Sequence, residues 1–133
     1  MRYMIDSNII LDVLLEREPF YSSSRRVLDL CEDRCIMGFI SASTATDIFY
    51  LIRKALGSID AAYNSLGSIL RIVSVLTVTN DDVSIAFEKR AKDFEDCLLA
   101  TCAISNHCDG IVTRNSRDFI GFDIDILSPE DVA

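Results

Sequence analysis

The chain has 133 residues, of which 50% are hydrophobic; this is the composition of an ordinary globular domain and excludes a largely disordered chain. Its formal net charge is −8, so binding to nucleic acid is disfavoured unless part of the acid serves to hold cations. No apolar stretch approaches the roughly 18 residues of a membrane helix, and Asp6 interrupts any signal-peptide pattern. We therefore expect one cytoplasmic domain over residues 1–133, without a membrane partner.

The five cysteines and the single histidine argue against a zinc site and against catalysis by a histidine. The cysteines are odd in number, and three fall in or beside one apolar helical stretch, which is typical of reduced, buried thiols. Cys31 and Cys35 lack a second ligand pair at a spacing that suits zinc. His107 stands alone at a predicted helix end, so catalysis by a histidine acid or base is also disfavoured.

Strand-like and helical patterns alternate along the chain. Short apolar runs predict strands at residues 3–6, 36–41, 72–78, 110–113 and 124–127. Apolar spacing predicts helices between them, at residues 7–17, 20–31, 45–56, 58–70, 80–92 and 93–109, the third ending at Gly57. This alternation predicts a three-layer α/β/α sandwich with a central parallel sheet.

Acidic side chains recur where these elements meet. Asp6 follows the first strand, Asp47 lies early in the helix after the second, and Asp118 follows the fourth. Asp93 and Asp96 begin the last long helix at i, i+3 spacing. Asp47 could simply lie on a solvated helix face, and the other acids could simply cap or start a helix. Alternatively, the acids converge on one edge of the sheet and bind a cation that relieves their repulsion. Oxygen ligands without Cys or His favour Mg²⁺ or Mn²⁺.

Several segments, taken in order, resemble the PIN-domain family of metal-dependent ribonucleases, which includes the VapC-type toxins of bacterial toxin–antitoxin pairs. The segments are residues 5–8 with 11–20, then 41–47, 93–96 and 112–119. The resemblance covers essentially the whole chain. It implies a Rossmann-like sandwich with a cluster of acids that binds magnesium or manganese.

The resemblance also implies which residues form the site. The first three acids of the family fall on Asp6, Asp47 and Asp96, which are expected to be catalytic and to bind the metal. Asp93 and Asp118 are expected as further ligands. The second acid is often Glu in relatives, so the shorter Asp47 leaves the number of metals open.

Polar and basic residues complete the expected site. Many relatives carry an acid where this chain has Asn115. The side chains expected to orient water or phosphate are Ser7, Asn8, Thr44 and Asn115. The side chains expected to bind RNA phosphates are Arg53, Lys54, Arg114 and Arg117. Ordinary surface charge is the alternative for these four.

The sequence thus predicts a metal-dependent endoribonuclease that acts on RNA, the toxin of a toxin–antitoxin pair, with an antitoxin as partner and a homodimer as its assembly. The alternative is a weakly active or inactive module that keeps the fold and acts through protein or RNA binding, since Asn115 replaces an acid. A metal-dependent phosphatase is disfavoured because no Asp-x-Asp pair follows the first strand.

Overall fold

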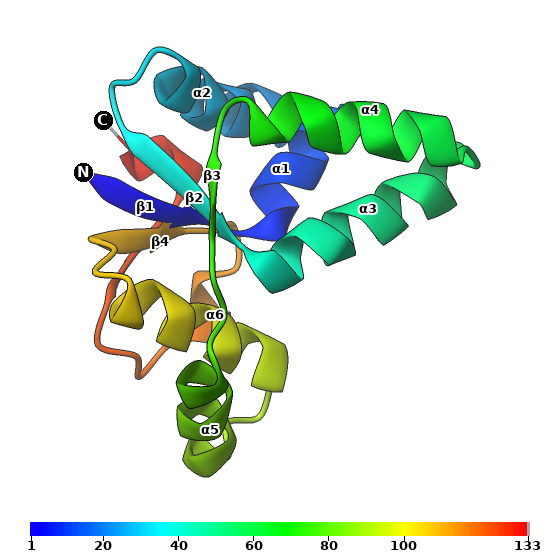
Figure 1. Cartoon of the computed structure of the whole chain (residues 1–133). Helices are drawn as coiled ribbons and strands as arrows, with labels where there is room; N and C mark the ends of the chain where they lie inside the picture. Colours follow the sequence, from blue (N-terminus) through cyan, green and yellow to red (C-terminus); the bar gives the residue numbers. More distant parts are fainter. Residues whose placement is uncertain (133) are drawn as a thin grey trace.

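The computed structural model describes residues 1–132 and has three layers around a parallel sheet (Figure 1). The strand order is β3-β2-β1-β4-β5, and every pairing is parallel. The strands are β1 (Arg2–Ile5), β2 (Met37–Ser41), β3 (Ser74–Leu76), β4 (Gly110–Val112) and β5 (Asp125–Leu127). The α-helices are α1 (Ser7–Leu14), α2 (Tyr21–Glu32), α3 (Ala42–Leu56), α4 (Ile59–Leu70), α5 (Asn80–Lys89) and α6 (Phe94–Ser105). Two 3₁₀ helices follow, η1 (Ser116–Phe119) and η2 (Pro129–Asp131). The predicted fold class is confirmed.

Alternating side chains of the central strands build a core on each face of the sheet. Tyr3 and Ile5 of β1 pack with the buried residues of α1 to α4, whereas Met4 packs with those of α6 and η1. Figure 1 shows α1 to α4 on one side of the sheet and α6 on the other. Helix α5 packs against α6. Over residues 1–132, none of the helices combines the length and the apolar character that crossing a bilayer requires.

The C-terminal end of α3 agrees with the prediction, whereas that of α1 does not. Helix α3 ends at Gly57 as predicted, and this residue has a φ of 64°, which costs glycine little. Helix α1 ends at Leu14, earlier than predicted. The chain turns there because Glu16 has a φ of 49° and the Arg17 N–H donates to the carbonyl of Asp12 at 2.9 Å.

The carboxyl ends of the central strands meet at one edge of the sheet. Strand β1 leads into Asp6, and its backbone N–H donates to the carbonyl of Val112 at the end of β4 (3.0 Å). Strand β2 leads directly into α3 through Ser41. The parallel pairing therefore brings the start of α1, the start of α3 and the segment after β4 to the same edge.

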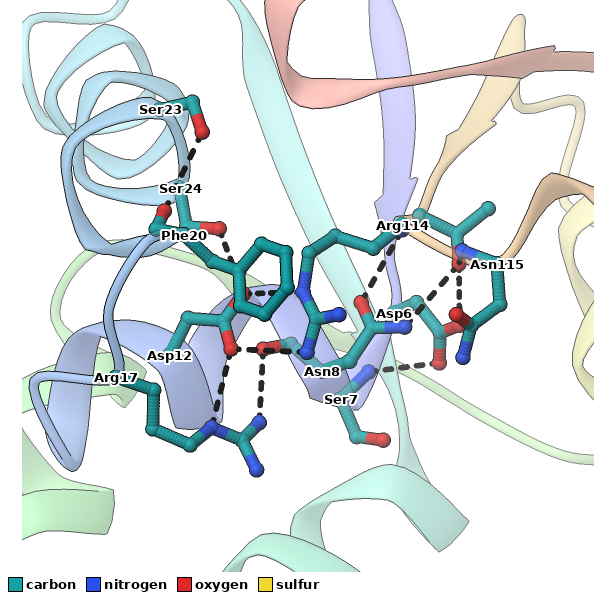
Figure 2. Close-up of polar contacts among 11 residues, drawn as sticks. Asp6, Ser7, Asn8, Asp12, Arg17, Phe20, Ser23, Ser24, Arg114 and Asn115 are labelled. Carbon is teal, nitrogen blue, oxygen red and sulfur yellow. Dashed lines mark hydrogen bonds and ion pairs between the residues drawn. The ribbon is translucent and has the colours of Figure 1, made fainter.

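A buried carboxylate fixes one side of this edge. The side chain of Asp12, in α1, is fully buried and accepts from Nε and Nη2 of Arg114 at 2.6 and 3.0 Å. It also accepts from Nε of Arg17 (3.0 Å) and Oγ of Ser24 (3.0 Å) (Figure 2). The Arg114 guanidinium lies 3.8 Å from the centre of the Phe20 ring. This network joins α1, α2 and the segment after β4.

We expect Asp12→Ala to lower the free energy of unfolding by about 3–5 kcal/mol, because it removes the buried partner of two guanidinium groups. Asp29→Ala is the matched control. Asp29 pairs with Arg25 on the exposed face of α2, and such a pair contributes less than about 1 kcal/mol. Urea unfolding followed by circular dichroism measures both. Equal losses in the two variants would contradict a special role for Asp12.

Candidate active site

A small hollow lies at the carboxyl edge of the sheet, and its volume is about 20 Å³. This is room for one water or one ion. Three elements supply its walls: the start of α1, the first turns of α3 and the first turns of α6. The residues that line it are Asp6, Ser7, Ser41, Ser43, Thr44, Asp47, Glu95, Asp96, Leu98 and Leu99.

Asp6 is held by contacts on both carboxylate oxygens. It is the N-cap of α1, where Oδ1 accepts from the backbone N–H of Ser7 (2.8 Å; Figure 2). Its Oδ2 accepts from Oγ1 of Thr113, the residue after β4 (2.8 Å). Burial raises the pKa of Asp6 above its ordinary value, although these hydrogen bonds act in the opposite direction. Asp6 therefore caps a helix and also faces the hollow, so capping does not exclude a function.

Asp47 and Glu95 meet across the hollow, from α3 and α6. They share a side-chain hydrogen bond, which raises the pKa of Glu95 to about 7 because a protonated carboxyl group is needed as donor. Partial burial and the neighbouring carboxylates act in the same direction. Glu95 is not among the residues predicted from the sequence; its place between the predicted acids Asp93 and Asp96 is the signal that points to it.

Asp96 is the second acid that α6 contributes to the hollow. Burial, followed by the negative charges of Asp93, Asp6 and Asp118, raises its pKa to about 6. Asp93 is the N-cap of α6 and accepts from the backbone N–H of Asp96 at 3.0 Å. Asp93 and Asp118 line a neighbouring hollow instead. Asp93 stays next to Asp96 through this hydrogen bond, and the charges of Asp93 and Asp118 contribute to the raised pKa of Asp96.

The predicted polar residues divide into two groups. Ser7 and Thr44 line the acidic hollow, and Oγ1 of Thr44 lies 2.9 Å from Oγ of Ser41. Asn8 does not line it, because its Nδ2 donates to Oγ1 of Thr113 (3.3 Å). Asn115 is exposed, and its backbone N–H donates to the same hydroxyl (3.0 Å). The side chain of Asn8 and the backbone of Asn115 therefore hold Thr113, which in turn holds Asp6.

The predicted basic residues lie in three different places. Arg114 is engaged by Asp12, as described above. Arg117 lines the hollow that contains Asp118, next to the acids. Arg53 and Lys54 lie in the last turn of α3, roughly 9 Å along the helix from Asp47 at 1.5 Å per residue. Of the four, Arg117 is the one that shares a hollow with predicted acids.

The donor set of the hollow fits a hard divalent cation, because the polar side chains that line it carry carboxylate and hydroxyl oxygens. Burial for Asp96 and the hydrogen bond to Asp47 for Glu95 are the main causes of their raised pKa values, and the charges of neighbouring carboxylates add to both; a cation would offset those charges. Among residues 1–132, no three His, Cys, Asp or Glu side chains are already gathered as a metal site.

The fold and this acidic edge define the class of protein. A family model for the PIN domain matches residues 2–117. The chain belongs to the PIN-domain family, whose members are generally nucleases that use a divalent metal ion. A search of curated proteins by sequence gave no match.

Solved structures share this fold at low sequence identity. DNA-bound VapBC from Salmonella typhimurium superposes with a TM-score of 0.75 at 20% identity, over 97% of this chain and 98% of that one. VapC20 from Mycobacterium tuberculosis, a toxin that cleaves the sarcin–ricin loop, gives 0.71 at 16% identity, over 90% and 95%. A toxin–antitoxin complex from Klebsiella pneumoniae gives 0.68 at 17% identity, over 98% and 99%. The chain is therefore similar in fold to VapC toxins over nearly its whole length.

The raised pKa of Glu95 predicts how stability depends on pH without metal. Its pKa is about 7 in the folded chain, against 4.5 for an unperturbed Glu. The folded state therefore holds the proton more tightly, and the stabilisation is lost as pH rises from about 4.5 to 7. In EDTA we expect the melting temperature to fall over this range. Glu95→Gln, which mimics the protonated group, should reduce the fall; an identical pH profile in wild type and variant would argue against the Glu95–Asp47 contact.

Proposed function

We propose that this protein is a metal-dependent endoribonuclease that hydrolyses RNA phosphodiester bonds, and that it is the toxin of a toxin–antitoxin pair. One observation carries the proposal: four carboxyl groups, those of Asp6, Asp47, Glu95 and Asp96, line one hollow at the carboxyl edge of the sheet in a PIN-family chain. This concentration of acid is costly for stability alone and useful for binding a cation.

Asp6, Asp47 and Asp96 are the residues that would hold Mg²⁺ or Mn²⁺. A bound ion of this kind activates water for attack on phosphorus and offsets the charge on the phosphate and leaving oxygen. Glu95 positions Asp47 through their hydrogen bond. Asp93 and Asp118 support the site by adding negative charge beside Asp96. Residues 1–133 then act as one nuclease domain.

The remaining candidates take roles that follow from their positions. The hydroxyl groups of Ser7 and Thr44 face the hollow and can orient water or a phosphate oxygen. Asn8 and Asn115 support Asp6 through Thr113. The basic residues for RNA phosphates are Arg117 beside the acids and, farther along the RNA, Arg53 and Lys54. Arg114 acts mainly as a structural cation because Asp12 engages its guanidinium.

The α3–α4 hairpin offers a surface for protein partners. Tyr50, Leu56, Ile59 and Tyr63 are each at least half exposed there. Apolar side chains gathered in this way indicate a protein interface. We assign this surface to a homodimer, and we propose an antitoxin as a further partner because similar structures contain toxin–antitoxin complexes. The expected compartment is the cytoplasm.

The rival function is a binding module without catalysis. Among residues 1–132, no three His, Cys, Asp or Glu side chains lie close enough together to hold a metal ion, and this favours the binding module. The presence of four carboxyl groups in one hollow favours the enzyme, because RNA binding alone would be weakened by that negative charge. Two measurements distinguish them.

The first concerns the ion. Mn²⁺ or Mg²⁺ should stabilise the protein by roughly 2.7 kcal/mol at an ion concentration 100 times the Kd, because the unfolded chain lacks the site. Thermal melting in EDTA and with excess ion measures this effect. Asp6→Asn should abolish most of the shift, whereas Asp60→Asn, in the first turn of α4, should keep it. A wild-type protein with no shift in either ion has no metal site.

The second concerns activity. Asp6→Asn and Asp96→Asn should each lower the single-turnover rate of RNA cleavage on the order of a hundredfold or more, since they remove ligand charge and keep volume. Asn caps a helix about as well as Asp, so a role in capping alone would leave the rate unchanged. Asp60→Asn is again the control. Full activity in both site variants would refute the assignment, and an inert wild type with saturating Mn²⁺ and any antitoxin removed would favour the binding module.

A further inference from the structure

Strand β3 forms one edge of the sheet, and the strand order leaves its outer side open. It pairs with β2 on its inner side. Within residues 1–132, the backbone of Ser74–Leu76 makes no hydrogen bond outside that pairing. Neighbouring residues of a strand direct their N–H and C=O groups to opposite sides, so some of these groups point away from β2. A row of unpaired groups of this kind can receive a further strand.

The sequence around β3 lacks the features that usually protect an exposed edge. Residues 72–79 read Ile-Val-Ser-Val-Leu-Thr-Val-Thr, without a charged residue, a proline or a glycine. Most of these side chains are β-branched, a type that favours strands. Proteins commonly block an edge with a lysine, a proline or a bulge. Val75, in the middle of β3, is instead 45% exposed. This segment is therefore better suited to pairing than to contact with water.

Opposite charges lie at the two ends of this segment. Arg71 follows α4, and Asp81 lies in the first turn of α5. Both are exposed, and in the described part of the chain neither takes part in an ion pair. Residues 73–79 run as an extended stretch between them (Figure 1), which spans roughly 20 Å at 3.3 Å per residue. Each charge also has an exposed apolar side chain nearby in sequence, Leu70 before Arg71 and Val83 after Asp81.

We propose that a second copy of this chain pairs with β3, strand against strand, in the antiparallel direction about a two-fold axis at Val75. A two-fold axis requires a surface that is complementary to itself. Pairing about Val75 places residue 71 of one copy opposite residue 79 of the other, so Arg71 of each copy reaches Asp81 of the other. The same symmetry brings Leu70 towards Val83. The two Val75 side chains form a cross-strand pair of β-branched residues.

Charge favours a copy of the chain as the occupant of this edge. The net charge of −8 opposes self-association in general, whereas residues 72–79 carry no charge and the two ends of the segment attract each other across the axis. The paired strands run in opposite directions, so the two acidic hollows lie at opposite ends of the joint sheet. The inference does not depend on the proposed nuclease activity. Its residues differ from those of the α3–α4 hairpin surface, and a chain that uses both surfaces assembles beyond the dimer.

The first test measures mass in solution. It uses a background with Tyr63→Lys, which removes the proposed hairpin contact, and Cys35→Ser, which removes the exposed thiol. Gel filtration with light scattering should give twice the mass of one chain for this background. Val75→Lys should give the mass of one chain, because two lysines would face each other at the axis. Val75→Thr is the matched control; it keeps a neutral β-branched side chain and should keep the dimer.

The second test measures the register by cross-linking. Val75→Cys in the same background should form a disulfide with its own copy under mild oxidation. Residues that face each other at the axis have Cα atoms about 4.5–5.5 Å apart, which is within the range of disulfides. Thr77→Cys is the matched control, since Thr77 is also exposed. Its two copies would lie roughly 13 Å apart along the paired strands and should not link.

The third test exchanges the charges at the two ends. Arg71→Glu and Asp81→Arg should each weaken the association about tenfold, because each change places like charges together at two symmetric positions. The double variant should restore the association. Lys92→Glu makes the same change of charge in the link between α5 and α6 and should leave the association unchanged.

Thermal melting of each variant confirms that it is folded. A background protein with the mass of one chain, a dimer that Val75→Lys leaves intact, equal cross-linking at positions 75 and 77, or a double charge variant weaker than either single one would overturn the inference. If the wild type is a dimer and the background protein is a monomer, the hairpin dimer stands and the pairing at β3 fails. RNA cleavage by the wild type is assayed separately, and its absence would count against the nuclease alone.

Discussion

The acidic edge depends on the ion pairs that the buried carboxylate of Asp12 forms with two arginines. A charge with no exposed surface is tolerated only when it is fully paired, and here two guanidinium groups and a hydroxyl surround it. Arg114 reaches Asp12 from the segment after β4, 102 residues away in sequence. The pair therefore fixes that segment against α1. Thr113 precedes Arg114, and its hydroxyl holds Asp6, so the position of the first acid follows from an ion pair outside the hollow.

The hollow itself has the opposite electrostatic character. Its carboxyl groups face one another without a basic side chain among the lining residues, and protons in part replace the missing positive charge. Crowding of this kind makes the site responsive to a cation, because an ion would take the place of those protons. Asp12 lies within α1, and Asp6 is the N-cap of the same helix. Arginine side chains neutralise Asp12, whereas Asp6 is left to be neutralised by a ligand.

The charges along the edge are unevenly distributed. The acidic hollow has no basic side chain in its lining, whereas the neighbouring hollow is lined by Lys92 and Arg117 together with Asp93 and Asp118. With a net charge of −8, the chain as a whole disfavours contact with polyanions, so these two cations are the local exception beside the acids.

The alternation of apolar runs determined the fold class, because a strand buried on both faces and an amphipathic helix have different periods. It also placed Asp6 and Asp47 near strand ends and Asp96 in the first turn of a helix, and the structure brings the three to one hollow. The sequence alone did not distinguish Asp93 from Glu95. The i, i+3 spacing of Asp93 and Asp96 presumes a helix, but Asp93 is the non-helical N-cap, and Glu95 reaches the hollow instead. The roles of Asp12 and Arg114 were likewise decided by tertiary structure, since a buried pair between residues far apart in sequence has no local signature. The periodicity of apolar residues indicates which face of a helix or strand is buried. Only tertiary packing decides which charged side chains pair with one another.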